Sequence, residues 1–185
     1  MDNDFWRYAG ASRFCYNWCL NRWQEHYRNG KICSAYSLQK ELVVLKKTPE
    51  CSWLSEISKH IPEQAATNVE RAYDHFFRRV KQNKNGKGLG FPKFKRRGKS
   101  KPAFTFSFDS SKKVPLRGHL LILPVLGRVN ISRRHFGELI PVSGRITRIT
   151  IKHDGKCWHA SLLFKIPTPP KPQPPSGSPV GIDLG

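Results

Sequence analysis

The hydrophobic period of the chain changes at residue 83, and this change constrains the fold more than any other feature. Before it, apolar residues recur at three- and four-residue steps, the period of amphipathic helices. After it, residues 104–108 alternate apolar and polar side chains, as a half-buried strand does. Residues 83–90 are rich in Gly, Asn and Lys and would end any helix. We therefore expect an α+β protein, a helical bundle followed by a small antiparallel β-barrel.

The first helix is expected over residues 5–23, with one apolar stripe along it. Asn29 and Gly30 follow and would close it. Cys15 and Cys19 lie four residues apart on the apolar face. We expect them to be buried as small apolar side chains rather than to form half of a metal site.

The remaining helical pattern is shorter and more interrupted. We expect a second helix over residues 38–47, capped by Ser37, and an amphipathic turn at 53–57. Pro62 is favourable in a first turn and would open a longer helix, whose buried stripe ends at Val80.

The second half of the chain carries strand patterns. Strands are expected over residues 104–108, 119–123, 128–132, 146–152 and 157–164. Asp154 and Gly155 stand between the last two, which predicts a hairpin there.

These patterns divide the chain into five parts. Residues 1–82 form the helical bundle, 83–101 a basic loop and 102–166 the antiparallel β module. Residues 167–179 are dominated by proline and read as a stiff, extended linker. Residues 180–185 have a buried-strand pattern with no sheet to join, so we expect them to be the first strand of a further domain that is missing.

Positive charge is concentrated in the second part of the chain. The whole sequence has 33 Lys plus Arg against 13 Asp plus Glu, a formal net charge of +20. Residues 1–74 carry ten basic and nine acidic side chains, whereas residues 75–185 carry 23 and four. Residues 78–101 hold eleven Lys or Arg and no acid. A surface that repels itself this strongly needs a polyanion, and we expect nucleic acid.

A membrane is a poorer partner for this charge. The glycines and the proline between residues 86 and 98 prevent the continuous amphipathic helix that a membrane surface would require. The chain opens with no signal-peptide pattern, and its longest apolar run, 120–126, is too short to cross a bilayer. We expect a cytoplasmic, nucleoid-associated protein with no membrane contact.

The candidate nucleic-acid-binding residues are cations, one amide and one aromatic ring. They are Arg13, Asn17, Arg78, Arg79, Lys81, Lys84, Lys87, Lys93, Phe94, Lys95, Arg96, Arg97, Lys99, Lys101 and Arg128. The cations would neutralise phosphates, and Asn17 could read a base edge or a phosphate. Phe94, with Phe91, either stacks on unpaired bases or plugs the loop onto the β module.

Asp183 is the one candidate metal ligand. An acid inside an apolar strand is costly to bury unless it is paired or binds a cation, so a magnesium ligand is a reasonable interpretation. Magnesium-dependent phosphoryl transfer needs at least two such carboxylates, and this motif offers one. The alternative is an Asp that ends the strand at a turn. The five cysteines form no C-x-x-C pair, so no zinc site is expected.

The order of the motifs resembles the TnpB (OrfB) family of transposon-encoded proteins, relatives of the type V CRISPR effector nucleases. The matching segments are 12–18 (Ser-Arg-Phe-Cys-Tyr-Asn-Trp), 72–78 (Ala-Tyr-Asp-His-Phe-Phe-Arg), 90–95 (Gly-Phe-Pro-Lys-Phe-Lys), 104–108 (Phe-Thr-Phe-Ser-Phe), 123–128 (Leu-Pro-Val-Leu-Gly-Arg) and 181–185 (Gly-Ile-Asp-Leu-Gly).

The resemblance implies an architecture and an activity. The helices would be a recognition lobe and the β module a wedge domain, followed by a RuvC-like nuclease domain and a zinc ribbon. Asp183 would be the first catalytic carboxylate, binding Mg²⁺ with a Glu and an Asp that this sequence lacks. The partners would be guide RNA and double-stranded target DNA, and the chain alone would not cut DNA.

Two other interpretations stay open. The chain could be a non-catalytic relative that binds DNA or RNA, as a repressor or a decayed transposase fragment. A ribosomal or other structural RNA-binding protein would share the basic run, but it gives no reason for residues 181–185.

Overall fold

The computed structural model describes residues 2–82, 90–108, 116–132 and 145–167, and it confirms the α+β class. The helical half comprises α1 (Asp2–Arg28), α2 (Ala35–Leu45), the 3₁₀ helix η1 (Pro49–Glu56) and α3 (His60–Gln82). The strands are β1 (Ala103–Ser107), β2 (Leu116–Arg117), β3 (Leu120–Leu123), β4 (Gly127–Asn130), β5 (Arg145–His153) and β6 (Trp158–Lys165).

Helix α1 is the expected first helix and the longest element of the fold. Its apolar stripe faces the core, and Cys15 and Cys19 are fully buried in it, as expected. The helix ends where Gly30 adopts a φ of +66°, a conformation that glycine takes without steric cost. The backbone N–H of Lys31 then donates to the carbonyl of His26 at 2.9 Å, which closes the last turn.

The expected start of the second helix was wrong by one helical turn. Helix α2 begins at Ala35 and its cap is Ser34, not Ser37. The Ser34 hydroxyl accepts the Ser37 N–H at 3.2 Å, and the Ser37 hydroxyl accepts the Ser34 N–H at 3.0 Å. Ser37 therefore sits at the third helical position of a capping box, where it satisfies a second orphan donor.

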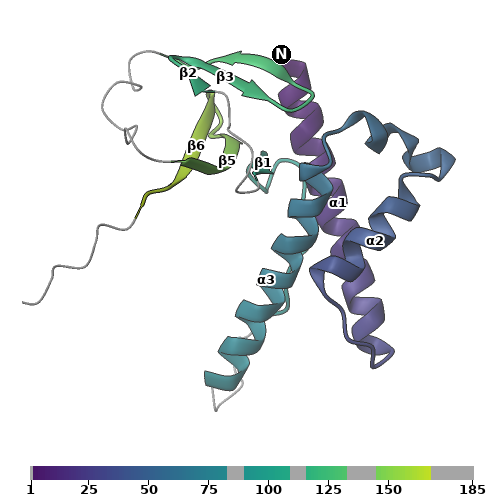
Figure 1. The fold of residues 1–185 in the computed structure, drawn as a ribbon. Helices are drawn as coiled ribbons and strands as arrows, with labels where there is room; N and C mark the ends of the chain where they lie inside the picture. Colours follow the sequence, from purple (N-terminus) through teal and green to yellow (C-terminus); the bar gives the residue numbers. More distant parts are fainter. Residues whose placement is uncertain (1, 83–89, 109–115, 133–144, 168–185) are drawn as a thin grey trace, which may run out of the picture.

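Helix α3 starts at His60, so Pro62 lies inside its first turn, where a missing N–H costs nothing. The expected buried stripe holds from Ala65 to Phe76. Val80, expected to end that stripe, is 44% exposed. Figure 1 shows the C-terminal ends of α1 and α3 splayed apart.

The strands form two antiparallel three-stranded sheets, with orders β1-β5-β6 and β2-β3-β4. Within the described ranges their pairing does not close into a ring. The antiparallel β module expected from the sequence is therefore seen there as two open sheets, and not as a closed barrel. The five expected strands are found within about two residues of their expected ends. Strand β2 was not expected, because two residues are too short to show a period.

The hairpin between β5 and β6 is the one indicated by Asp154 and Gly155. His153 pairs with Trp158, so the connection holds residues 154–157. Asp154 stabilises it, because its Oδ1 accepts the N–H groups of Lys156 at 2.7 Å and Cys157 at 2.9 Å.

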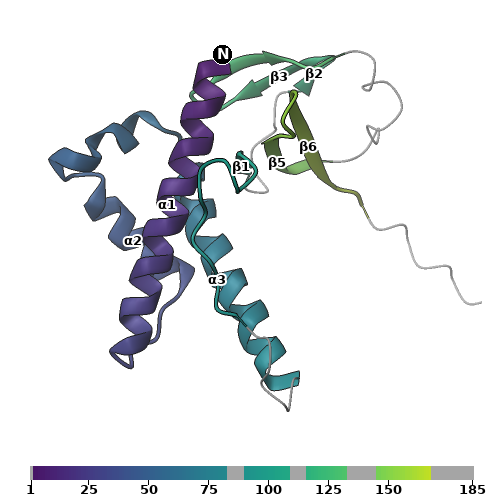
Figure 2. The same ribbon diagram turned by 180° about the vertical axis from the view of Figure 1, so that it is seen from behind.

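The helices and the sheets share one hydrophobic core. The N-terminal half of α1 packs on β1, where the ring of Phe104 lies 5.7 Å from Phe5 and 5.4 Å from Tyr8. The C-terminal half of α1 packs against α3, where Trp23 stacks on Tyr73 at 4.7 Å. Residues 90–101 are the described part of the basic loop, and we call them the basic segment. Figure 2 shows this segment running along α1 and α3 to β1, so it lies on the helices.

Candidate nucleic-acid interface

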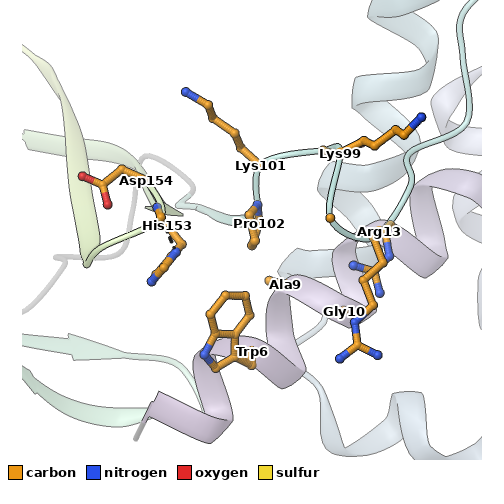
Figure 3. A pocket seen from close by; sticks show the side chains of 13 residues that line it. Trp6, Ala9, Gly10, Arg13, Lys99, Lys101, Pro102, His153 and Asp154 are labelled. Atoms are coloured by element: carbon orange, nitrogen blue, oxygen red, sulfur yellow. Dashed lines mark hydrogen bonds between the residues drawn. The ribbon is translucent and has the colours of Figure 1, made fainter.

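A groove of about 1050 Å³ lies where the basic segment reaches the sheet. Its walls come from three parts of the chain, namely the exposed face of α1, residues 97–102 and the β5–β6 hairpin (Figure 3). The residues that line it are Trp6, Ala9, Gly10, Arg13, Arg97, Gly98, Lys99, Ser100, Lys101, Pro102, His153, Asp154 and Gly155. We call this the cationic groove.

Asn17 on α1 holds the basic segment in place. Its Nδ2 donates to the carbonyl of Lys95 at 2.9 Å, and its Oδ1 accepts the Lys95 N–H at 2.8 Å. Both polar ends of the amide are thus used by the backbone of the segment. The structure places Asn17 as an anchor of the basic segment rather than as a group directed at a base.

Lys95 is also turned inward. Its ammonium lies 4.2 Å from the centre of the Tyr16 ring, a cation–π contact, and burial lowers the pKa of Lys95 below its ordinary value. The neighbouring turn is closed by the Ser100 N–H, which donates to the Arg96 carbonyl at 2.9 Å. This turn presents Arg97 and Lys99 to the groove.

Charge in the groove is strongly biased. Four cations line it, Arg13, Arg97, Lys99 and Lys101, against the single carboxylate of Asp154. Hydrogen bonds from the backbone of Cys157 and Lys156, and one with His159, hold the pKa of Asp154 well below its usual value. Figure 3 shows that its carboxylate points away from Trp6, so the groove itself presents mainly positive charge.

Trp6 is a groove residue that was not among the expected site residues. The indole is 43% exposed, and its ring lies 4.8 Å from His153 and 5.1 Å from Trp158. Trp6 is seven residues before Arg13, so the two lie on the same face of α1. Apart from its chain neighbours and the local helix backbone, no atom lies within 4 Å of where a Cβ on Gly10 would be, which leaves the floor beside the indole open.

The sequence pattern that could have indicated Trp6 is its position outside the apolar stripe of the first helix. A large aromatic residue on the polar face of a helix, two turns before an arginine, has no core to fill and is a candidate for a planar ligand. His153 of β5 lies at the groove wall.

A second, smaller depression of about 570 Å³ continues the cationic surface. It shares Lys99 and Ser100 with the groove and adds Lys93, Phe94 and Arg96, among others. Phe94 is 46% exposed there and stays a candidate for base stacking.

Phe91 packs the basic segment against the rest of the fold, which was one of the two interpretations of this residue, but its partner differs from the expected one. Its ring stacks on Phe76 of α3 at 4.6 Å, so it fixes the basic segment to a helix rather than to the β module.

The other expected site residues lie elsewhere. Arg78, Arg79 and Lys81 are exposed in the last turns of α3, where Arg79 Nε donates to the His75 carbonyl at 3.3 Å. Arg128 is exposed on β4. Lys84, Lys87 and Asp183 lie outside the described residues.

The groove is therefore built from part of the expected set. The structure brings together Arg13, Arg97, Lys99 and Lys101, with Lys93, Phe94 and Arg96 alongside. In both ribbon views the C-terminal end of α3 points away from the sheets (Figures 1 and 2). Over the described part of the chain, no helix combines the length and apolar character that crossing a membrane requires.

A family model described as a helix-turn-helix domain, named for OrfB proteins, matches residues 2–31. These residues hold the single helix α1 and its closing turn, and α2 follows from Ala35. The helix pair is held by Glu41 of α2, whose oxygens lie 2.6 Å from Arg22 Nε and 2.6 Å from His26 Nε2.

Curated relatives match almost the whole chain. A protein of Escherichia coli (strain K12) named "Putative RNA-guided DNA endonuclease InsQ" is 30% identical over 182 residues, which cover 97% of this chain and 40% of that protein. A "Putative RNA-guided DNA endonuclease" of Streptomyces pristinaespiralis is 28% identical, covering 97% of this chain and 41% of the relative.

Another similarly named protein, of Mycobacterium tuberculosis (strain CDC 1551 / Oshkosh), is 25% identical over 196 residues, which cover 97% of this chain and 42% of that protein. The chain thus spans about two fifths of the length of the curated relatives that it matches. These relatives and the matched domain confirm the resemblance that the motifs indicated, which is to the TnpB (OrfB) family of transposon-encoded proteins.

Proposed function

We propose that this chain binds guide RNA and target DNA as the nucleic-acid-binding part of a TnpB-like RNA-guided DNA endonuclease. The observation that carries the proposal is the cationic groove, which four cations and an exposed indole from separate parts of the chain line together. The names of the relatives, RNA-guided DNA endonucleases, support the choice of ligand.

The groove suits a nucleic acid backbone that carries at least one unpaired base. Arg13, Arg97, Lys99 and Lys101 would neutralise phosphates and release condensed counterions. The exposed indole of Trp6 would stack on a base, which every base allows because each has a π face. Cations beside an aromatic platform are the pattern that proteins use for single strands and RNA loops.

No catalytic step is assigned to the described residues. The family resemblance gives Asp183 to a magnesium site, and that residue lies outside the described part. Mg²⁺ held by several carboxylates would supply charge stabilisation for phosphodiester cleavage. We propose that Asp183 needs further carboxylates from a longer protein, that this chain alone does not cleave DNA, and that it acts at the nucleoid in the cytoplasm.

Binding is tested by fluorescence anisotropy with labelled single-stranded RNA, a structured RNA hairpin and duplex DNA, each over a range of salt concentrations. A variant with Arg97, Lys99 and Lys101 all changed to Gln should lose most of the affinity. The matched control changes Lys31, Lys40 and Lys59 to Gln, which removes the same charge from exposed positions away from the groove. Equal weakening of both variants would mean that overall charge, and not the groove, binds the ligand.

Cleavage is tested with the same chain, guide RNA and target DNA in the presence of Mg²⁺. We expect no product. Cleavage that disappears on Asp183→Ala would show that the chain holds a working nuclease centre and would overturn this part of the proposal, while the binding result would stand by itself.

A further inference from the structure

Three side chains of different ligand chemistry meet at the tip of the β5–β6 hairpin. They are Asp154, Cys157 and His159, all exposed, and their donor atoms lie within 4.8 Å of one another. His159 Nε2 is 2.7 Å from Asp154 Oδ2 and 3.4 Å from Cys157 Sγ. The carboxylate and the thiol therefore approach the same nitrogen of the imidazole.

Nε2 of His159 can make a full hydrogen bond with only one of these two neighbours at a time. If Nε2 carries the proton, it donates to Asp154, and the sulfur of Cys157 is left beside a donor that is already used. If Nε2 is unprotonated, it accepts from the thiol but faces the lone pairs of the carboxylate. A cation in place of the proton would attract all three donor atoms at once.

The carboxylate is already oriented for such a role. Asp154 Oδ1 accepts the two N–H groups of the turn, from Lys156 and Cys157, which fixes the plane of the carboxylate and leaves Oδ2 directed at His159. Hydrogen bonds to the second oxygen of a ligating carboxylate commonly position metal ligands in this way. Figure 3 shows the carboxylate of Asp154 directed away from Trp6, at the edge of the cationic groove, and neither Cys157 nor His159 lines that groove.

The N–S distance is close to that of a tetrahedral zinc site, and the N–O distance is shorter than such a site requires. Zinc bond lengths place neighbouring N and S ligands roughly 3.6 Å apart and neighbouring N and O ligands roughly 3.3 Å apart. The N–S distance here is 3.4 Å. The N–O contact of 2.7 Å would have to lengthen by roughly 0.6 Å to reach the tetrahedral value, a shift that exposed side chains can make.

We propose that Asp154, Cys157 and His159 bind one divalent cation of the zinc class, with the fourth position open to water. Thiolate and imidazole ligands select Zn²⁺ and Co²⁺ over Mg²⁺ and Ca²⁺, which prefer oxygen. The lack of a C-x-x-C pair predicted no zinc site, but this site uses one cysteine. The proposal does not depend on nucleic-acid binding. Its structural consequence is that the metal would stiffen the hairpin that forms one wall of the cationic groove.

The probe is Co²⁺, titrated into the full reduced chain and followed by absorption spectroscopy. We expect one equivalent to bind with a thiolate-to-cobalt charge-transfer band and with the visible bands of a tetrahedral ion. One equivalent of Zn²⁺ should displace it, and a large excess of Mg²⁺ should not. Cys157→Ser should abolish the charge-transfer band, and His159→Gln should abolish stoichiometric binding. Asp154→Asn keeps an oxygen for the turn and should weaken binding.

The matched controls are Cys33→Ser and His75→Gln. Cys33 is the other cysteine outside the buried class, and His75 is an exposed histidine on α3. Both variants should bind Co²⁺ as the unchanged chain does, and circular dichroism should confirm the same fold for all five variants. The proposal is overturned if the chain shows no charge-transfer band, if the band survives Cys157→Ser, or if Cys33→Ser removes it.

Discussion

The side-chain amide of Asn17 in α1 donates one hydrogen bond to the backbone of Lys95, 78 residues further along the chain, and accepts another from it. This pair ties the strongly cationic segment to a helix from the nearly neutral part of the protein. Because the segment then turns at Gly98, where φ is +79°, its cations are presented at the mouth of the groove. The position of the charge thus depends on an uncharged residue.

Replacing Asn17 with Ala should destabilise the protein and loosen the basic segment. Loss of two partly buried hydrogen bonds should lower the free energy of unfolding by about 1–3 kcal/mol, as measured by urea denaturation. Trypsin should also cleave after Lys93 and Arg97 faster than in the unchanged chain, because the freed backbone fits a protease better.

The control for this change is Asn21→Ala, one turn later on the exposed side of α1. Asn21 is exposed and donates to the partly exposed Glu25 at 2.6 Å, so its loss should change the stability little. Equal destabilisation by both substitutions would argue that Asn17 acts through helix propensity and not through Lys95.

The elements of the fold were largely predictable, because each follows from a local period. Each of these signals is visible within a short stretch of sequence: the apolar stripe of α1, the alternation of apolar and polar side chains in β1 and the turn residues of the β5–β6 hairpin. Errors arose where two local signals compete. Ser34 and Ser37 are both good caps, and only the reciprocal bonds between them decide which one begins α2.

The site was predictable in composition but not in geometry. Residue type marked Arg97, Lys99 and Lys101 as phosphate ligands, and the structure gathers them. Residue type could not reveal that Lys95 in the same run turns inward onto Tyr16, because that depends on a contact across the fold. The same holds for Trp6, which becomes a groove residue only when the hairpin is folded against α1.

Changing Trp6 to Ala should reduce affinity for single-stranded RNA. Stacking of one base on an aromatic side chain is worth about 1–3 kcal/mol, so the dissociation constant should rise roughly 5- to 150-fold, whereas Trp6→Phe should keep most of the affinity. Anisotropy with a short labelled RNA measures this.

Trp53→Ala removes an indole from η1, where it packs edge-on against Phe14 at 5.4 Å, and it should leave RNA affinity unchanged. The thermal stability of both variants should be measured as well, since Trp6 also contacts Trp158. Unchanged RNA binding by a folded Trp6→Ala variant would remove the indole from the proposed interface.

Acid should weaken the contact between α1 and α2. Burial alone would raise the pKa of Glu41, but hydrogen bonds with His26 and Arg22 outweigh it and lower the pKa below its ordinary value of 4.5. The unfolded chain therefore binds this proton more tightly than the folded one. The stabilisation is fully present above the unfolded pKa and is lost as the pH falls through the folded pKa.

Replacing Glu41 with Gln should lower the free energy of unfolding at neutral pH by about 1 kcal/mol and should flatten its decline between roughly pH 5 and pH 3. Urea denaturation across this range gives both quantities. Glu50→Gln, at an exposed position of η1, should alter neither. If the free energy of unfolding of Glu41→Gln declined in acid as steeply as that of the unchanged chain, other carboxylates would be the cause of the lost stability.

Lys101 and Lys95 should behave oppositely although both belong to the basic run. Lys101 is exposed at the groove, so Lys101→Gln should weaken duplex binding and reduce the slope of log K against log salt by about 0.9, the contribution of one phosphate. Lys95 already uses its ammonium on Tyr16, so Lys95→Gln should leave the slope unchanged and lower thermal stability instead. Salt titrations and thermal melts of the two variants separate these outcomes. Equal changes of slope would show that charge acts through the whole segment and that the inward orientation of Lys95 is irrelevant to binding.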